Sequence, residues 1–158
     1  MKRAIVLVLM GTLLVGVLGS TVSAQPVNFR AVLSGGGEVP GVDTAARGFA
    51  MYQLNDEGTE LSFILVAANI QDVTQAHIHV GAVDATGPVV AFLLHPVDAP
   101  IGRFNGVLAQ GTITEADLVG PLAGQPFSDL VEAMQAGNTY TNVHTVVNPG
   151  GAIRGQNF

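Results

Sequence analysis

The chain contains no cysteine. This absence excludes disulfides, a thiolate nucleophile, thiol redox chemistry and a blue-copper centre, whose copper needs a cysteine ligand. It also excludes a lipoprotein anchor, because there is no cysteine to carry the lipid. A domain without disulfides must be held together by its hydrophobic core alone.

Positive charge is also scarce. The chain has six lysines and arginines against twelve acidic residues, and two of the six, Lys2 and Arg3, stand at the extreme N-terminus. From residue 25 onward the cations are four arginines, which gives a net charge of −8. Such a surface is repelled by phosphate backbones and anionic lipid heads, so we expect neither nucleic acid nor a membrane surface as a partner. Metal cations and basic partners remain possible.

The first 24 residues have the three parts of a secretory signal peptide. Lys2 and Arg3 precede an apolar run over residues 4–18, and the segment ends in small residues at Val22-Ser23-Ala24. The run has about 15 residues, fewer than the ~20 that cross a bilayer. We therefore expect cleavage after Ala24 and a secreted or periplasmic domain over residues 25–158, with no membrane span after cleavage. A retained N-terminal anchor is the alternative.

Period-two alternation of apolar residues dominates the rest of the chain. In the first segment Val27, Phe29, Ala31 and Leu33 share one face of a predicted strand. The segment 89–94 is apolar on both faces, which favours a central strand. The predicted strands cover residues 27–33, 47–54, 59–68, 75–80, 89–94, 102–112, 140–146 and 152–156.

Two short helices interrupt this pattern. Thr114 is placed as the N-cap of a turn over residues 115–118, and residues 127–136 carry apolar side chains at helical spacing before Gly137. About eight short strands with glycine and proline turns predict an all-β fold. The expected architecture is an antiparallel β-sandwich or flattened barrel with one or two short helices, formed by a single domain.

Four ordered stretches resemble the CHRD domain, a family named for chordin and widespread in secreted bacterial proteins. They are LSG at 33–35 with EVP at 38–40, AHIHVG at 76–81, GPVV at 87–90, and YTNVHT at 140–145 running into NPGGAIRGQ at 148–156. The resemblance covers residues 28 to 156 and implies an extracellular all-β module. It implies little about activity, and the growth-factor antagonism of chordin as a whole is not carried over to a solitary domain.

Two positions depart from the family pattern. Gly41 stands where the family usually has a second proline, and Ala152 stands where it usually has an acidic residue. If that acid were a ligand or a partner of Arg154, this chain would lack it.

Three of the four histidines lie inside the resembling stretches. On a strand, His77 and His79 project to the same face, so their imidazoles can converge on one cation at about 2 Å each. His144 offers a third nitrogen from another strand, with Asn142 and Tyr140 on its face. Three imidazoles without a thiolate suit copper, alternatively zinc, better than Mg²⁺ or Ca²⁺. With ordinary pKa values near 6.5, they would bind metal at neutral pH and release it on acidification.

The remaining candidates surround this set. His95, before Pro96, is a possible fourth ligand. Arg154 is expected to be structural, pairing with a carboxylate such as Glu38 and fixing the last strand, or else to orient a group beside the metal. Glu38 itself is expected to be an ordinary loop carboxylate, and Asn142 a supporting residue.

The sequence thus predicts a secreted module that binds a transition metal through His77, His79 and His144. No catalytic residue is assigned, because neither a phosphate loop nor a nucleophile elbow is present; whether the domain is an enzyme stays open, with binding favoured. One alternative is an extracellular or envelope module that binds a protein or glycan and has structural histidines. Another is a copper enzyme similar to superoxide dismutase.

Exported protein is expected to begin at Gln25. The reason is that Ala24 is the last small residue before Pro26 opens the strand region. Intact-mass measurement on exported protein checks this, and a mass that retains residues 1–18 would instead support the membrane anchor.

Overall fold

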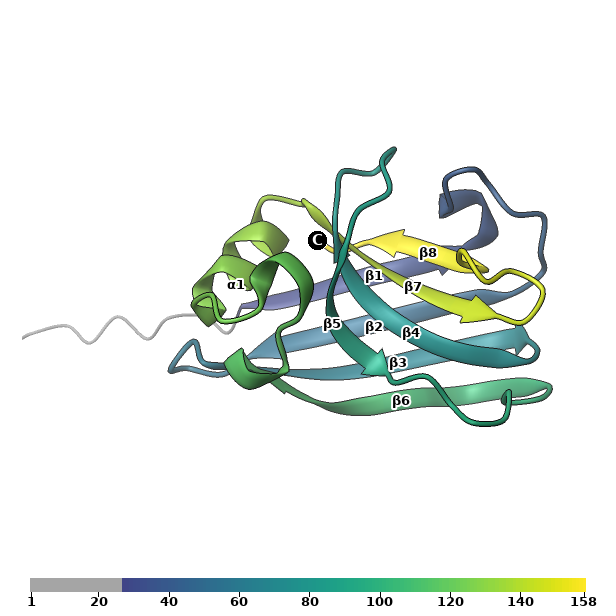
Figure 1. Ribbon diagram of the computed structural model, residues 1–158, viewed down its shortest axis with the longest axis horizontal. Helices are drawn as coiled ribbons and strands as arrows, with labels where there is room; N and C mark the ends of the chain where they lie inside the picture. The colour runs from purple at the N-terminus through teal and green to yellow at the C-terminus, as the bar shows by residue number, and fades with distance from the viewer. Residues whose placement is uncertain (1–26) are drawn as a thin grey trace, which may run out of the picture.

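The computed structural model describes residues 27–158, so the expected signal peptide lies outside the described residues. Eight strands form one sheet (Figure 1). They are β1 (Asn28–Ser34), β2 (Arg47–Leu54), β3 (Glu60–Ile70), β4 (Val73–Val80), β5 (Val89–Leu94), β6 (Phe104–Thr114), β7 (Thr139–Thr145) and β8 (Ile153–Gln156). Within the described part of the chain, no helix is long and apolar enough to cross a membrane.

The sheet curls into a nearly closed barrel. Its strand order is β5-β4-β7-β8-β1-β2-β3-β6, and all of these pairs are antiparallel. The two edge strands, β5 and β6, approach each other across the remaining gap. The all-β prediction is confirmed, and of its two forms the flattened barrel describes the molecule.

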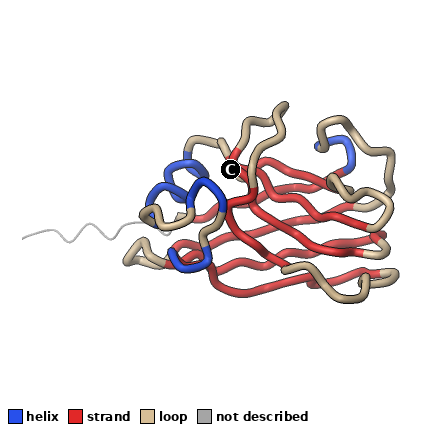
Figure 2. Tube along the Cα trace, viewed as in Figure 1, coloured by secondary structure: helices blue, strands red, loops and turns tan. Residues whose placement is uncertain are grey.

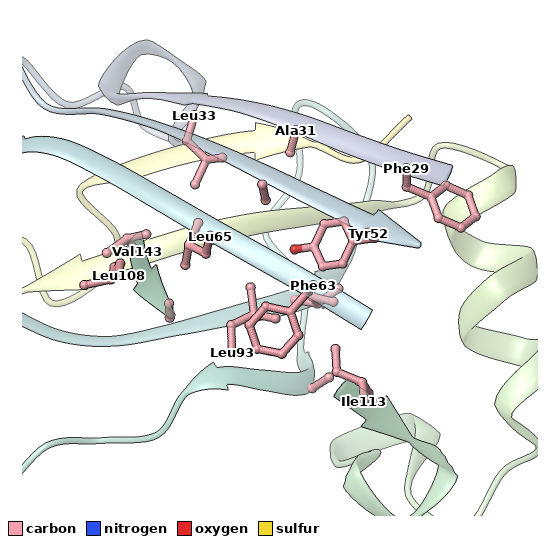
Figure 3. Packing of buried hydrophobic residues seen from close by; sticks show 14 of the residues in the cluster. Phe29, Ala31, Leu33, Tyr52, Phe63, Leu65, Leu93, Leu108, Ile113 and Val143 are labelled. Atoms are coloured by element: carbon pink, nitrogen blue, oxygen red, sulfur yellow. The ribbon is translucent and has the colours of Figure 1, made fainter. Parts of the chain in front are cut away.

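The barrel interior is filled mainly by apolar side chains from the inward faces of the strands. In β1, Phe29, Ala31 and Leu33 point inward, as the alternation predicts, and in β3 the inward set begins with Leu61 and Phe63. Figure 3 shows these side chains meeting residues from the opposite wall. The core therefore occupies the inside of the barrel, and Thr141 of β7, which also points inward, hydrogen-bonds Tyr52 there.

Helical segments gather mainly at one end of the barrel (Figure 2). The helix α1 (Phe127–Gln135) buries Phe127, Leu130, Val131 and Met134, which matches the predicted helix. The helix expected after Thr114 is only a 3-10 turn, η2 (Glu115–Asp117), in which the Asp117 carboxylate accepts hydrogen bonds from Thr114. Two further 3-10 turns, η1 (Gly35–Gly37) and η3 (Gly120–Leu122), were not predicted.

The central position expected for residues 89–94 is wrong, because β5 is an edge strand. Its apolar character on both faces has another cause: Val90 and Leu93 join the core, whereas Phe92 lies against a histidine ring on the outer face. The segment after η2 covers the open edge, since Val119 N–H donates to the Val90 carbonyl. An edge strand covered in this way avoids exposed unpaired backbone groups.

The outer wall of β1, β2, β3 and β6 carries exposed apolar side chains. Val32 lies opposite Phe49, and Met51 lies opposite Ile64. These four side chains and Val107 on β6 are between 36% and 71% exposed. This wall has no covering layer among the described residues, in contrast to the wall of β4, β7 and β8.

Glycine at position 155 is required by the close approach of β8 to β1. A Cβ at Gly155 would overlap the carbonyl oxygen of Val32, which is backbone and cannot rotate away. Gly155→Ala is therefore expected to lower the free energy of unfolding by about 1–3 kcal/mol, the usual range for overpacking. Gly150→Ala, at a position with nothing within 4 Å of the added carbon, is the control and should change it little. Denaturant unfolding of both variants tests this, and equal stability would contradict it.

Candidate metal centre

The pairing of β4 with β7 assembles the histidines on the outer face of the barrel. His77 lies opposite Asn142, and His79 lies opposite Tyr140. His144 is two residues further along β7, so it shares the face of Asn142 and Tyr140. The alternate residues Ala76, Ile78 and Val143 fill the core.

The three imidazoles converge as the strand geometry predicts. Each ring offers one nitrogen, and these nitrogens all lie within 4.8 Å of one another. His77 Nδ1 and His144 Nε2 lie 3.1 Å apart, within hydrogen-bond distance. His144 therefore lies close enough to His77 and His79 for all three rings to reach one ion.

The cluster is buried although it lies outside the barrel. His77, His79 and His144 are 3%, 8% and 6% exposed. Two loops hold the outer rings: Gly87, in the β4–β5 loop, accepts a hydrogen bond from His79 Nδ1 at 2.8 Å, and Pro149, in the β7–β8 turn, accepts one from His144 Nδ1 at 2.9 Å.

These two carbonyls fix the tautomers. A carbonyl oxygen can only accept, so His79 and His144 each carry their hydrogen on Nδ1, and a neutral ring then has its lone pair on Nε2. His79 Nε2 is buried with no hydrogen-bond partner, and so is His77 Nε2. Buried polar atoms are nearly always paired, so two unpartnered ring nitrogens in one cluster are an unusual feature of this site.

The ordinary pKa values expected for these histidines are corrected by the structure. Burial, followed by the neighbouring imidazoles of His144 and His79, lowers the pKa of His77 to about 3. Burial likewise lowers the pKa of His79 and His144, against the opposing effect of their carbonyl partners. All three rings therefore stay neutral to lower pH than a solvent-exposed histidine, and His77 does so down to a pH of about 3.

His95 is not part of the cluster. It lies on the surface and stacks on Phe92, with ring centroids 4.7 Å apart. Phe92 in turn contacts the His77 ring edge-on at 4.8 Å. His95, which was expected as a possible fourth ligand, thus does not belong to the group of three converging nitrogens.

Arg154 on β8 takes a structural position beside the cluster. Its guanidinium carbon lies 3.4 Å from the centroid of the Tyr140 ring, whose other neighbour is the His79 ring, stacked at 4.7 Å and 7°. Its Nη2 donates to the carbonyls of Ala82 and Val83 in the β4–β5 loop. Arg154 therefore holds that loop over the outer wall, and its hydrogen bonds go to these carbonyls instead of to Glu38.

Glu38 is more unusual than the loop carboxylate that was expected. It is 9% exposed, and its Oε1 has no hydrogen-bond partner. The carboxylate fills the space above Gly151, where a Cβ would overlap it. Burial raises the pKa of Glu38 to about 7, against the opposing charge of Arg154. It lies outside the group of converging ligand atoms.

Sequence reasoning missed Phe92 and Gln156. Gln156 lies opposite Tyr140, and its Nε2 donates to the carbonyls of Gly81 and Gly137. It therefore links β8 to the β4–β5 loop and to the connection between α1 and β7. Gln156 belongs to the Ile-Arg-Gly-Gln stretch that resembles the family, but no local pattern shows that the β4–β5 loop folds back over it.

A buried polar cluster on the outer wall of an eight-stranded antiparallel barrel defines the class: an all-β domain with a candidate metal centre. The CHRD domain family model matches residues 29–157, and the chain belongs to this family, as its motifs predicted. Neither a curated protein nor a solved structure matches the chain.

The metal-free protein is expected to lose stability as the pH falls below about 6.5. The unfolded chain binds protons at the ordinary histidine pKa of 6.5, whereas folded His77 does so only near 3. The unfolded state is therefore favoured in that window, by at most about 1.4 kcal/mol per pH unit for each imidazole. Urea unfolding of chelator-treated protein at pH 7.5 and 5.0 measures the loss.

Glu38 acts in the opposite direction and serves as the control. Its pKa is raised from 4.5 to about 7, so its contribution is present below pH 4.5 and is lost as the pH rises to 7. Glu38→Gln should therefore steepen the fall in stability between pH 7.5 and 5.0. A pH-independent unfolding free energy in both proteins would contradict the assigned neutral histidines.

Proposed function

We propose that this CHRD domain is exported and binds one transition-metal ion, copper or zinc, through His77, His79 and His144. The observation that supports the proposal most directly is the pair of buried, unpartnered Nε2 atoms of His77 and His79. Export is supported by the signal-peptide pattern of residues 1–24.

A bound cation accounts for features that a purely structural role leaves unexplained. Three ring nitrogens lie within 4.8 Å of one another in a buried site, and His77 Nε2 and His79 Nε2 there have no hydrogen-bond partner. The carbonyls of Gly87 and Pro149 accept the Nδ1 hydrogens, which is the arrangement that orients metal-binding imidazoles and raises their basicity. A purely structural role does not explain why Nε2 of both His77 and His79 is buried without a hydrogen-bond partner.

The donor chemistry favours copper or zinc. Neutral imidazoles suit these ions, whereas Mg²⁺ and Ca²⁺ prefer carboxylate and carbonyl oxygens, and no Asp or Glu belongs to the cluster. The low exposure of all three rings favours holding an ion over exchanging a substrate at it. Metal retention, with no assigned catalysis, is the function that these features support best.

Removing a cluster histidine is expected to abolish tight binding. Wild-type protein should take up one ion per chain in titrations with Cu²⁺ or Zn²⁺ against a competing chelator. His77→Ala or His144→Ala should weaken binding by roughly 100-fold or more, because two imidazoles form an incomplete chelate. His95→Ala is the matched control and should stay within about threefold, since an exposed ring that binds no metal contributes little.

Circular dichroism on each variant separates loss of a ligand from loss of the fold. The three-histidine site would be overturned if folded wild-type protein bound no ion. It would also be overturned if His95→Ala weakened binding as much as His144→Ala.

A further inference from the structure

Asn142 lies at the centre of the histidine cluster. It is 2% exposed, lies opposite His77 on the neighbouring strand, and precedes His144 by two residues on the same face. Its Oδ1 lies 3.0 Å from His144 Nε2, and its amide is near enough to His77 and His79 to oppose the lowering of their pKa values. One amide side chain therefore lies beside all three imidazoles.

The contact with His144 places two lone-pair donors side by side. Asn142 Oδ1 lies 3.0 Å from His144 Nε2. The hydrogen of the neutral His144 ring is on Nδ1, where it bonds the Pro149 carbonyl. Nε2 and Oδ1 are then both acceptors with no hydrogen between them, an arrangement that a shared cation would stabilise.

The spacing is that of neighbouring ligands on one ion. Two donors about 2.0–2.1 Å from a metal and about 90–110° apart are separated by roughly 2.9–3.4 Å. The distance from His144 Nε2 to Asn142 Oδ1 is 3.0 Å, which falls within this range. The amide oxygen is therefore placed as a second donor to an ion bound by His144 Nε2.

We propose that Asn142 Oδ1 is the fourth ligand of the metal, which makes the site a set of three imidazole nitrogens and one amide oxygen. The inference rests on the proposed metal-binding function and extends it. Four protein donors complete a closed site of the kind that retains an ion, whereas hydrolytic zinc centres leave the fourth position to water. Asn142, and not His95, is then the residue that completes the sphere.

Two substitutions of similar shape test the assignment. Asn142→Leu removes the oxygen and is expected to weaken Zn²⁺ and Cu²⁺ binding by roughly tenfold or more, as loss of a ligand does. Asn142→Asp keeps an oxygen at the same place and adds a negative charge. In Cu²⁺-loaded protein it should shift the electron paramagnetic resonance spectrum to a lower g∥ and a larger copper hyperfine splitting, because an anionic donor replaces a neutral one.

Gln75→Glu is the control for charge alone. Gln75 is half-buried on β4 and lies opposite His144, so the same amide-to-acid change occurs beside the cluster. Its copper spectrum should equal that of wild-type protein. Should Asn142→Leu fail to fold, as judged by circular dichroism, the spectrum of Asn142→Asp decides alone.

The outcomes separate this inference from the proposed function. If wild-type protein binds no ion, the metal-binding function itself fails. If wild-type protein binds one ion, but Asn142→Asp leaves the copper spectrum unchanged, Asn142 is not a ligand. Tighter binding by Asn142→Leu would also overturn the inference, because it would mean that the amide NH₂ group faces His144 and blocks its lone pair.

Discussion

The register between β4 and β7 is the constraint on which the candidate site depends. It places His77 opposite Asn142 and His79 opposite Tyr140, so that the histidine cluster is outside the barrel, whereas Thr141 points inward and hydrogen-bonds Tyr52. A slip of one residue would exchange the faces, sending the imidazoles into the core and Ile78 to the surface. The core therefore enforces the register, because Ala76, Ile78 and Val143 have no other apolar place to go.

A polar cluster on the outside of a barrel would ordinarily be exposed to solvent, and here the covering loops bury it. Arg154 and Gln156 on β8 donate to carbonyls of the β4–β5 loop, and His79 and Tyr140 both bond Gly87 at its far end. The loop is thus fastened by the residues that it buries. On the opposite wall, apolar side chains of β1, β2, β3 and β6 remain exposed.

Burial without full pairing sets the chemistry of the site. It removes water from the imidazoles, lowers their pKa values and leaves two Nε2 atoms without partners. Each unpaired buried acceptor costs about 1–3 kcal/mol, which a coordinated cation would offset. Glu38 shows the same condition nearby: its Oε1 is buried without a partner, and its pKa is raised. The unpaired buried atoms on the wall of β4, β7 and β8 therefore lower the stability of the fold, and they are also the donor atoms that a ligand could use.

The sequence by itself determined the all-β class, most strand positions and the family, because these follow from local alternation and from motifs read in order. It also determined that His77 and His79 share a face, since side chains on a strand repeat every two residues. Strand order was decided by the tertiary structure, which is why β5 is an edge strand although both of its faces are apolar. The tertiary structure also decided which residues distant in the sequence come together. His144 joins His77 and His79, whereas His95 stacks on Phe92. Arg154 hydrogen-bonds the β4–β5 loop instead of Glu38. The lowered pKa values belong to the same category, because burial depends on loops that fold back from elsewhere in the chain, and no local pattern encodes where a loop comes to rest.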